Sequence, residues 1–460
     1  MDGPEHRPIS RRRVLQLGAV AVPSALLAAC IEPSPSASPV ASATSTATAS
    51  PAATAPPEPT PTASLTPTGR FLYRDAALAD GHSATLRRGV SVLVDDGVIR
   101  WIRPVDGEED PGDAEVIDAS GATIVPGMVD SHCHVTGPGG ARWLDRFTDP
   151  PERLAEYAEE NGRLAWSAGI RWLRDLGSPV VDDQVDGRHR ALAIGIRDRW
   201  RGRRQFPAIR AAGTWMTKPG ALPTGVGVEA RDGDELRALA IRQLDDGADL
   251  VKVYFDSRDP SRSAWTLNEV RRVTDAVHAR GAKVAAHVGK LPGVRVAVAG
   301  GVDSVEHGNQ LDADVAREMV AKGVVLVTTL TVLRSFLTFG RTTRLSTFAG
   351  TGRMAAWGDE LEAVEASVRI ARDAGVTIAA GTDFGGGSGR ANQLAWEVES
   401  LVAAGLDPVD ALAAATWRGG ELIGEPDAGV IREGGPADFF LVHGDPLSDP
   451  AALWRVWRHA

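Results

Sequence analysis

The sequence predicts an α/β protein built as a (β/α)8 barrel of the TIM type, with a small composite β-sandwich formed by both ends of the folded region. In the middle of the chain, short apolar runs alternate with helical stretches, and strands that alternate with helices of about ten to fifteen residues are typical of parallel β/α units. Strand-like segments lie on both sides of this region, and their apolar faces need a common core. With 460 residues and 43% hydrophobic content, the chain can bury both parts.

Residues 1–30 predict an export signal. Arg11, Arg12 and Arg13 form a basic cluster before an apolar run, and small residues then lead to Cys30. The apolar run, at about sixteen residues, is shorter than the roughly twenty that cross a bilayer as a helix. "SRRRVLQ" resembles a twin-arginine export motif and "LAAC" resembles a bacterial lipoprotein cleavage box, which implies lipidation of Cys30. We therefore expect an exported protein, anchored by lipid to the outer face of the bacterial cytoplasmic membrane or on its periplasmic side; a chance amphipathic helix is the alternative.

Residues 31–68 predict a disordered tether, because they are nearly all Pro, Ser, Ala and Thr. Such a composition cannot bury enough apolar surface to fold. In an extended polyproline form, at about 3.1 Å per residue, the segment would reach on the order of 100 Å. The lipid would then be the only contact between the protein and the membrane.

The predicted β-sandwich combines residues 69–124 with residues 425–460. In the first piece, "SVLVDDGVIRWI" alternates apolar and polar residues around Asp96-Gly97, a dipeptide that favours a two-residue hairpin turn, and "AEVIDAS" adds a short strand. In the second piece, "ADFFLVHGD" is a further β-type run, and we expect a helix in "PAALWRVW". Strands with one apolar face must bury it, so we expect the two pieces to pack together.

The barrel is predicted for residues 125–424. Glycine stands where four of its helices are expected to end, which is the favoured place for a residue with positive φ. These glycines are Gly247, Gly281, Gly323 and Gly375. The eight predicted strands lie in "ATIVPGMVDSH", "GIRWLRDLG", "AIRAAGT", "DLVKVYFD", "KVAAHV", "DSVEHG", "VVLVTTL" and "VTIAAGTD".

Ligand-type side chains stand at the ends of these strands, where a β/α barrel has its active site. A lone His-x-His pair is a weak signal. Four histidines at the ends of three strands, together with an aspartate at the end of another, are harder to explain as packing, since buried polar groups need partners. The candidate metal ligands are His132, His134, Lys252, His287, Glu306, His307, Thr382 and Asp383.

Cys133 lies between two of these histidines and is interpreted as a packing residue. His132 and His134 are two positions apart and share one face of the strand, so Cys133 points to the opposite face, toward the helices. The remaining six histidines lie in the signal, turns, helices or tail, and we interpret them as structural or solvated. They are His6, His82, His189, His278, His443 and His459.

Charge and cysteine content exclude two classes of protein. The formal net charge is −10, whereas nucleic-acid-binding proteins concentrate positive charge on one face. The two cysteines, Cys30 and Cys133, lie in very different surroundings, which argues against a disulfide framework.

From about Arg70 to its end, the sequence resembles the amidohydrolase superfamily, in particular its imidazolonepropionase-like and prolidase-like members. The motifs that carry the resemblance are "VPGMVDSHCH", "RDLGS", "GADLVKVY", "AAHV", "SVEHG", "AAGTDFG" and "GPADFFLVHGDPL". The resemblance implies a β/α barrel flanked by a β-sandwich made from both chain ends.

The resemblance also implies a metal site. According to this resemblance, His132 and His134 bind one divalent ion together with Asp383, and His287 and His307 bind a second. Lys252 would bridge the two ions if carbon dioxide carboxylates it; as an ordinary cation it would leave a site for one ion. Imidazole and oxygen ligands favour zinc, with manganese, iron or cobalt as other choices.

The implied function is hydrolysis of a carbon–nitrogen bond in a small-molecule amide, dipeptide or cyclic amide. A metal-activated hydroxide would attack the carbonyl, with Asp383 as general acid and base. Tyr254 lies two residues after Lys252 and could either bind substrate or pack. The segment "TWMTKPGALPTG" departs from the family pattern in a pocket loop, so substrate recognition stays undetermined, and "ATWRGG" departs from it far from the metals.

Other functions compete with this interpretation. The same site could open a lactone or cleave an ester, or the barrel could keep its metal without catalysis. A solute-binding lipoprotein would share the export signal and the tether, but it predicts two lobes and no cluster of ligands. The sequence leaves the oligomeric state open, a homo-oligomer included.

Overall fold

The computed structural model describes residues 69–183, 187–222, 226–345, 348 and 350–460. The predicted export signal, Cys30 and the predicted tether lie outside these residues. Within the described ranges, no helix combines the length and the apolar character that crossing a bilayer requires.

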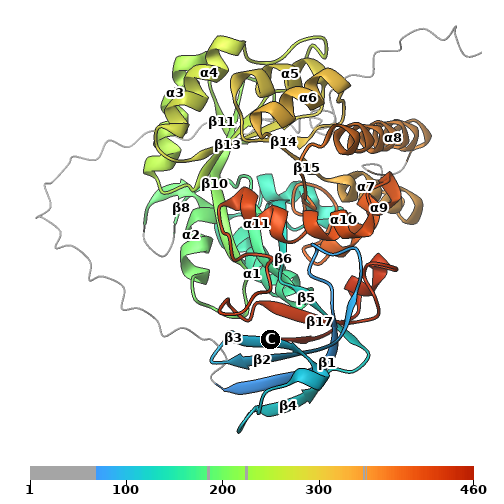
Figure 1. Ribbon diagram of the computed structural model, residues 1–460. Coiled ribbons are helices and arrows are strands. Elements are labelled where there is room, and N and C mark those ends of the chain that lie inside the picture. Colours follow the sequence, from blue (N-terminus) through green and yellow to red (C-terminus); the bar gives the residue numbers. More distant parts are fainter. Residues whose placement is uncertain (1–68, 184–186, 223–225, 346–347, 349) are drawn as a thin grey trace, which may run out of the picture.

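Eight parallel strands form the barrel, which confirms the predicted fold class (Figure 1). Each strand pairs with the next along the chain, and a parallel bridge between Cys133 and Phe384 joins the first strand to the segment after the last one. The short β11 (Val228–Glu229) adds to the edge of the third barrel strand. The barrel strands are β6 (Met128–Cys133), β7 (Ile170–Asp175), β10 (Ala208–Thr217), β12 (Leu250–Tyr254), β13 (Lys283–Val288), β14 (Ser304–His307), β15 (Val325–Thr328) and β16 (Ile378–Ala380).

Helices surround the barrel (Figure 1). Gly323 and Gly375 cap two of them with φ of 68° and 82°, as predicted, and Gly247 and Gly281 have positive φ just after two others. The helices are α1 (Pro151–Ser167), α2 (Leu192–Trp200), α3 (Gly233–Asp245), α4 (Leu267–His278), α5 (Leu291–Gly300), α6 (Ala313–Lys322), α7 (Leu330–Thr342), α8 (Thr351–Ala374), α9 (Leu394–Ala404), α10 (Pro408–Ala414) and α11 (Trp417–Ile423). A 3-10 helix, η2 (Gly140–Phe147), follows β6, and a small hairpin of β8 (Val180–Asp182) and β9 (His189–Ala191) follows β7.

The predicted composite β-sandwich is present, and its strands belong to one continuous sheet in the order β18-β17-β5-β1-β2-β3. Figure 1 shows β17, from the end of the chain, beside the strands from its beginning. Asp96 and Gly97 form the predicted hairpin turn with φ of 47° and 74°. The strands are β1 (Arg70–Leu78), β2 (Arg87–Asp95), β3 (Val98–Pro104), β4 (Glu115–Asp118), which pairs with β1, β5 (Ala122–Pro126), β17 (Phe439–His443) and β18 (Val456–His459).

The prediction of a helix in "PAALWRVW" is wrong for the second half of this segment. Only η3 (Pro450–Trp454) is helical, as a 3-10 helix, and the chain then enters β18. The edge of β17 offers unpaired backbone groups, and β18 pairs with it in antiparallel register. This pairing overrides the local preference for a helix.

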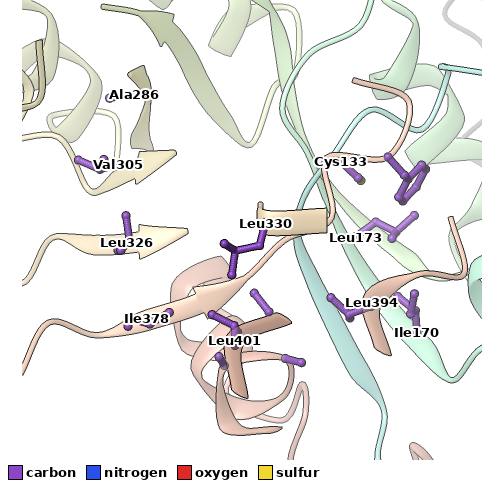
Figure 2. Close-up of a cluster of buried hydrophobic side chains, with 14 of the residues drawn as sticks. Cys133, Ile170, Leu173, Ala286, Val305, Leu326, Leu330, Ile378, Leu394 and Leu401 are labelled. Carbon is purple, nitrogen blue, oxygen red and sulfur yellow. The ribbon is translucent and has the colours of Figure 1, made fainter. Parts of the chain in front are cut away.

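Figure 2 shows the apolar layer between the barrel strands and the helices. Side chains such as Leu173, Val305 and Leu326 leave the outer face of the strands and are fully buried. Cys133 belongs to the same layer, and its Sγ lies 3.6 Å from the carbonyl oxygen of Arg174. The interpretation of Cys133 as a packing residue is therefore confirmed.

Candidate metal centre

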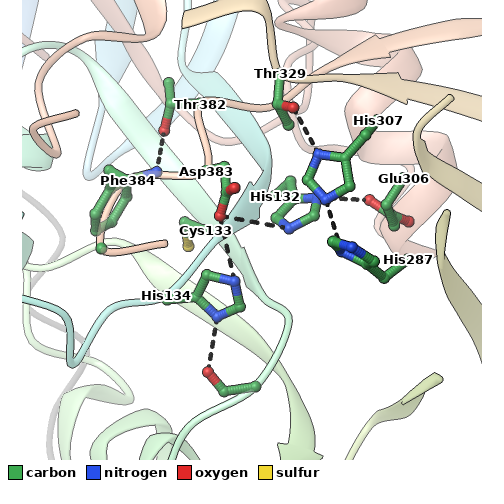
Figure 3. A network of polar contacts seen from close by, with 12 residues as sticks. His132, Cys133, His134, His287, Glu306, His307, Thr329, Thr382, Asp383 and Phe384 are labelled. Carbon is green, nitrogen blue, oxygen red and sulfur yellow. Dashed lines mark hydrogen bonds and ion pairs between the residues drawn. The ribbon is translucent and has the colours of Figure 1, made fainter. Parts of the chain in front are cut away.

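Three of the predicted ligands converge at the carboxyl ends of the first and last barrel strands (Figure 3). His132 belongs to β6, His134 follows it, and Asp383 comes three residues after β16. One ligand atom from each lies within 4.8 Å of the other two, and all three side chains are buried. Asp383 Oδ1 is 3.3 Å from His134 Nε2 and 3.6 Å from His132 Nε2.

Hydrogen bonds at the far side of each ring fix which nitrogen faces Asp383. His134 Nδ1 lies 2.8 Å from the carbonyl oxygen of Gly177, which can only accept, so Nδ1 carries the proton. His132 Nδ1 lies 2.9 Å from Glu306 Oε2 and donates in the same way. Burial lowers the pKa of both histidines below the ordinary value, which favours neutral rings.

Three acceptors therefore face one another. The Nε2 lone pairs of His132 and His134 point toward Oδ1 of Asp383, a buried carboxylate oxygen that has no hydrogen-bond donor among the residues that the structure describes. Lys252 Nζ lies 3.3 Å from His132 Nε2, but it leaves the three acceptors facing one another. Acceptors this close are unfavourable in a buried site, and a cation between them removes the conflict. The residues thus fit a divalent ion, and the donor set of two imidazoles and a carboxylate is common for zinc.

His287 and His307 form a second pair next to the first. His307 Nε2 and His287 Nδ1 are 3.0 Å apart, and His307 Nδ1 contacts Thr329 Oγ1 at 2.7 Å. Burial lowers the pKa of His307 to about 4. The ring of Tyr254 stacks on His287 with 3.9 Å between ring centroids, so Tyr254 borders this pair.

Lys252 is fully buried on β12, and its Nζ lies 3.3 Å from His132 Nε2. Burial lowers its pKa to about 8, so near that pH about half of the amines are neutral. A neutral amine is the form that can react with carbon dioxide.

Several side chains around the ligands position them, a role that sequence reasoning missed. Glu306, one of the candidate ligands, instead contacts the far side of His132, and Arg174 Nη1 donates to its Oε1 at 2.9 Å. Asp130 accepts hydrogen bonds from the backbone N–H groups of His132 and Thr382 at 3.2 and 3.0 Å. Asp130 also accepts a hydrogen bond from Thr382 Oγ1 at 2.6 Å, so the hydroxyl of Thr382 helps to hold Asp130. The signal for Asp130 was available, because it lies two residues before His132 on the same face of the strand.

Two residues of this site have a strained backbone conformation. In the described part of the chain, four residues other than glycine have positive φ, and His307 at 72° and Asp383 at 51° are two of them. Such conformations persist only where the surroundings hold them, and they cluster at functional sites.

The fold and the site together define a class of protein: a β/α barrel with a cluster of metal ligands at the carboxyl ends of its strands. Residues 123–457 match the Amidohydrolase family, and the chain belongs to this family, whose members typically bind divalent metal. The predicted resemblance is thereby confirmed, and the protein is a hydrolase.

Similar proteins include several hydrolases. Ochratoxinase from Aspergillus niger is 28% identical over 370 residues, covering 73% of this chain and 74% of its own. Imidazolonepropionase from Salinispora arenicola is 26% identical over 422 residues, covering 84% of this chain and 92% of its own. A crystal structure of a Xaa-Pro dipeptidase with bound methionine in the active site superposes with a TM-score of 0.72 at 23% identity, covering 84% and 97% of the two chains. That structure supports the shared fold.

Proposed function

We propose that this protein hydrolyses carbon–nitrogen bonds in small-molecule amides, dipeptides or cyclic amides with the help of divalent metal. The observation that carries the proposal is the meeting of three buried acceptors, from His132, His134 and Asp383, in a member of the amidohydrolase family. The names of the similar hydrolases agree with this bond type.

His132, His134 and Asp383 would hold one ion, and His287 with His307 would hold a second. Lys252 would connect them as a carbamate: its neutral amine attacks carbon dioxide, an N–C bond forms, one proton leaves, and two ligand oxygens result. A divalent ion in such a site lowers the pKa of a water molecule and polarises a substrate carbonyl.

Asp383 would act as general base and then as general acid. Its carboxylate accepts the proton of the attacking water while the new C–O bond forms at the substrate carbonyl. The same proton then passes to the leaving nitrogen as the C–N bond breaks, so one carboxylate serves both steps. Burial of the site excludes bulk water, which strengthens these charge interactions.

A substrate panel tests the proposal. The purified folded part, from about residue 69, is assayed against N-acyl amino acids, Xaa-Pro dipeptides, cyclic amides, lactones and esters. We expect hydrolysis of one of the amide groups, loss of activity on chelation, and recovery on adding zinc or manganese. Hydrolysis of lactones or esters alone would contradict the assigned bond, and activity that survives complete metal removal would contradict the assigned site.

We also propose that the protein is exported and held at the membrane by lipid on Cys30. The basic cluster, the apolar run and the "LAAC" box support this proposal. Expression with a radiolabelled fatty acid should label the wild-type protein in the membrane fraction. The Cys30→Ser variant should carry no label, and a labelled variant would refute the proposal.

A further inference from the structure

His287 has a neighbour at each of its two ring nitrogens. Its Nδ1 lies 3.0 Å from Nε2 of His307 (Figure 3), and its Nε2 lies 3.7 Å from Oδ2 of Asp256. Burial lowers the pKa of His287 well below the ordinary value, so the ring is neutral. A neutral ring carries one proton, which leaves a lone pair on the other nitrogen. The position of this proton decides whether the two histidines can bind an ion together.

The two tautomers of His287 have opposite consequences. With the proton on Nδ1, His287 donates to His307 Nε2 and occupies its lone pair, while its own Nε2 lone pair faces the carboxylate of Asp256, which is unfavourable. With the proton on Nε2, the N–H faces the carboxylate, and the Nδ1 lone pair faces His307. The hydroxyl oxygen of Thr329, 2.7 Å from His307 Nδ1, can accept a hydrogen bond from that nitrogen. Two lone pairs then face each other, as binding of one ion by both rings requires.

The fold holds the Asp256 carboxylate next to His287. Asp256 lies two residues after Tyr254, the last residue of β12, and its side chain is 24% exposed. Its Oδ2 accepts a hydrogen bond from the N–H of Gly289 at 2.9 Å, and its Oδ1 accepts one from the N–H of Lys290 at 3.2 Å. Both donors follow β13, the strand that carries His287. The carboxylate therefore cannot turn away from the ring without losing a hydrogen bond.

The end of β12 also holds the ring of His287. Tyr254 stacks on this ring with 3.9 Å between centroids and 15° between planes. The N–H of Phe255 donates to the carbonyl oxygen of His287 at 2.9 Å. The separation of 3.7 Å between Asp256 and Nε2 is longer than a hydrogen bond, so the carboxylate acts on the ring through its charge. The stack thus holds the plane of the ring, while the carboxylate selects which nitrogen keeps the proton.

We propose that Asp256 is a positioning residue that keeps the proton of His287 on Nε2 and so leaves Nδ1 free to bind the second ion with His307. This inference rests on the proposed function, because it concerns the second ion of that site. It assigns to a carboxylate at the second histidine pair the part that Gly177 and Glu306 play at the first pair. Partners of this kind fix the tautomer of a ligand, and their loss typically weakens metal binding by about 10- to 100-fold.

The tautomer of His287 can be measured without metal. Full-length protein with isotopically labelled histidine is treated with a chelator, and the nitrogen chemical shifts are recorded by NMR; the His287 signals are those lost in His287→Gln. In the wild type the shifts should place the proton on Nε2. In Asp256→Asn the carboxamide can turn its NH₂ group toward Nε2, so the proton should move to Nδ1. A proton on Nδ1 in the wild type would overturn the inference, whether or not the variant folds.

Zinc titration of the same proteins against a chromogenic chelator measures the consequence for metal binding. We expect two binding events in the wild type, one of which is lost in His287→Gln. In Asp256→Asn that event should weaken by about 10- to 100-fold, and the other should change by less than about threefold. An unchanged affinity for both ions would overturn the inference. A wild type with a single event that survives in His287→Gln would overturn it as well.

Asp303→Asn is the matched control. Asp303 also joins a histidine to a backbone donor, because its Oδ2 lies 2.9 Å from His278 Nε2 and accepts from the N–H of Val284 at 2.7 Å. Val284 lies near the start of β13, whereas His287 lies near its end. Asp303→Asn should leave the His287 tautomer and both zinc events unchanged, and effects equal to those of Asp256→Asn would contradict a specific role for Asp256. Absence of all amide hydrolysis, with the differences in tautomer and zinc affinity intact, would refute the proposed function and leave the role of Asp256 standing.

Discussion

Among the features of single residues, the position of the proton on the rings of His132 and His134 says most about what the site can bind. The carbonyl oxygen of Gly177 and the carboxylate of Glu306 accept hydrogen bonds from Nδ1–H of His134 and His132, so both Nε2 atoms are acceptors that face the carboxylate of Asp383. The sequence identified these ligands from their places at strand ends. It could not identify the partners of Nδ1, because those contacts join residues more than forty and more than one hundred and seventy positions apart.

Replacing Asp383 by Asn separates metal binding from proton transfer. The amide oxygen can still act as a ligand, but it cannot accept the proton of the attacking water. We expect turnover to fall by about 10² to 10⁴, the usual size of a general acid and base contribution, with much of the metal retained. Steady-state kinetics and elemental analysis of the same sample measure both effects. Asp182→Asn, at an exposed carboxylate on β8, is the matched control. Near-normal turnover in Asp383→Asn would remove this residue from the proposed role.

Replacing Lys252 by Ala tests the bridge between two ions. If a carbamate on Lys252 joins the two histidine pairs, its loss should reduce the metal content from two ions per chain to one or none. Elemental analysis of the wild-type and variant proteins gives the count directly. Bicarbonate added with a short carboxylic acid should restore part of the second ion in the variant. An unchanged metal count would show that Lys252 is not a ligand.

The strands place the ligands at one end of the barrel, and the turns at the strand ends set the directions of their side chains. On a regular strand, neighbouring side chains point to opposite faces, yet Glu306 contacts His132 while His307 contacts His287. Both can face the interior because His307 departs from strand geometry with φ of 72°. Strand periodicity therefore predicted the shared face of His132 and His134. The directions of the His307 and Asp383 side chains depend on left-handed backbone conformations, which periodicity does not describe.

The glycine-rich turn after β16 holds Asp383 in place, and a side chain at Gly386 would meet the Asp383 carboxylate directly. A Cβ at Gly386 would lie 1.8 Å from Asp383 Oδ1 and 2.8 Å from His134 Cδ2. In Gly386→Ala the carboxylate must move, so we expect activity to fall by about 10²-fold, as for other displacements of this size. The Kd for zinc, measured by competition with a chromogenic chelator, should rise with it.

Gly352 provides the control for this substitution. It lies on α8, and a Cβ there meets nothing within 4 Å. Gly352→Ala should leave activity and metal affinity unchanged. If Gly386→Ala matches Gly352→Ala in both measurements, the turn does not constrain Asp383.

At the scale of the whole molecule, the barrel and the composite sheet meet at Arg171. This buried side chain on β7 pairs with Asp438 at 3.1 Å, contacts His459 Nδ1 at 2.9 Å and covers the ring of Trp166 at 3.7 Å. The sequence predicted that both chain ends join one β structure, because their apolar runs need partners. It did not predict β18, whose pairing depends on the free edge of β17. Local pattern indicates which segments are strands, and tertiary contacts decide where the last one pairs.

His459 makes this junction sensitive to acid. Burial, together with the charge of Arg171, lowers its pKa from the ordinary 6.5 to about 4. Between these two values the unfolded chain binds a proton that the folded protein excludes, so the contribution of His459 to stability is lost as the pH falls from about 6.5 to about 4. His459→Gln carries no titrating ring, and it should therefore lose less stability than the wild type over this range. Thermal unfolding at pH 8 and pH 5 measures the difference: the fall in Tm should be smaller in the variant by no more than about 2–4 °C, the shift that ~1 kcal/mol gives in a large domain. Parallel falls in Tm for the two proteins would show that His459 binds its proton as readily in the folded protein as in the unfolded chain.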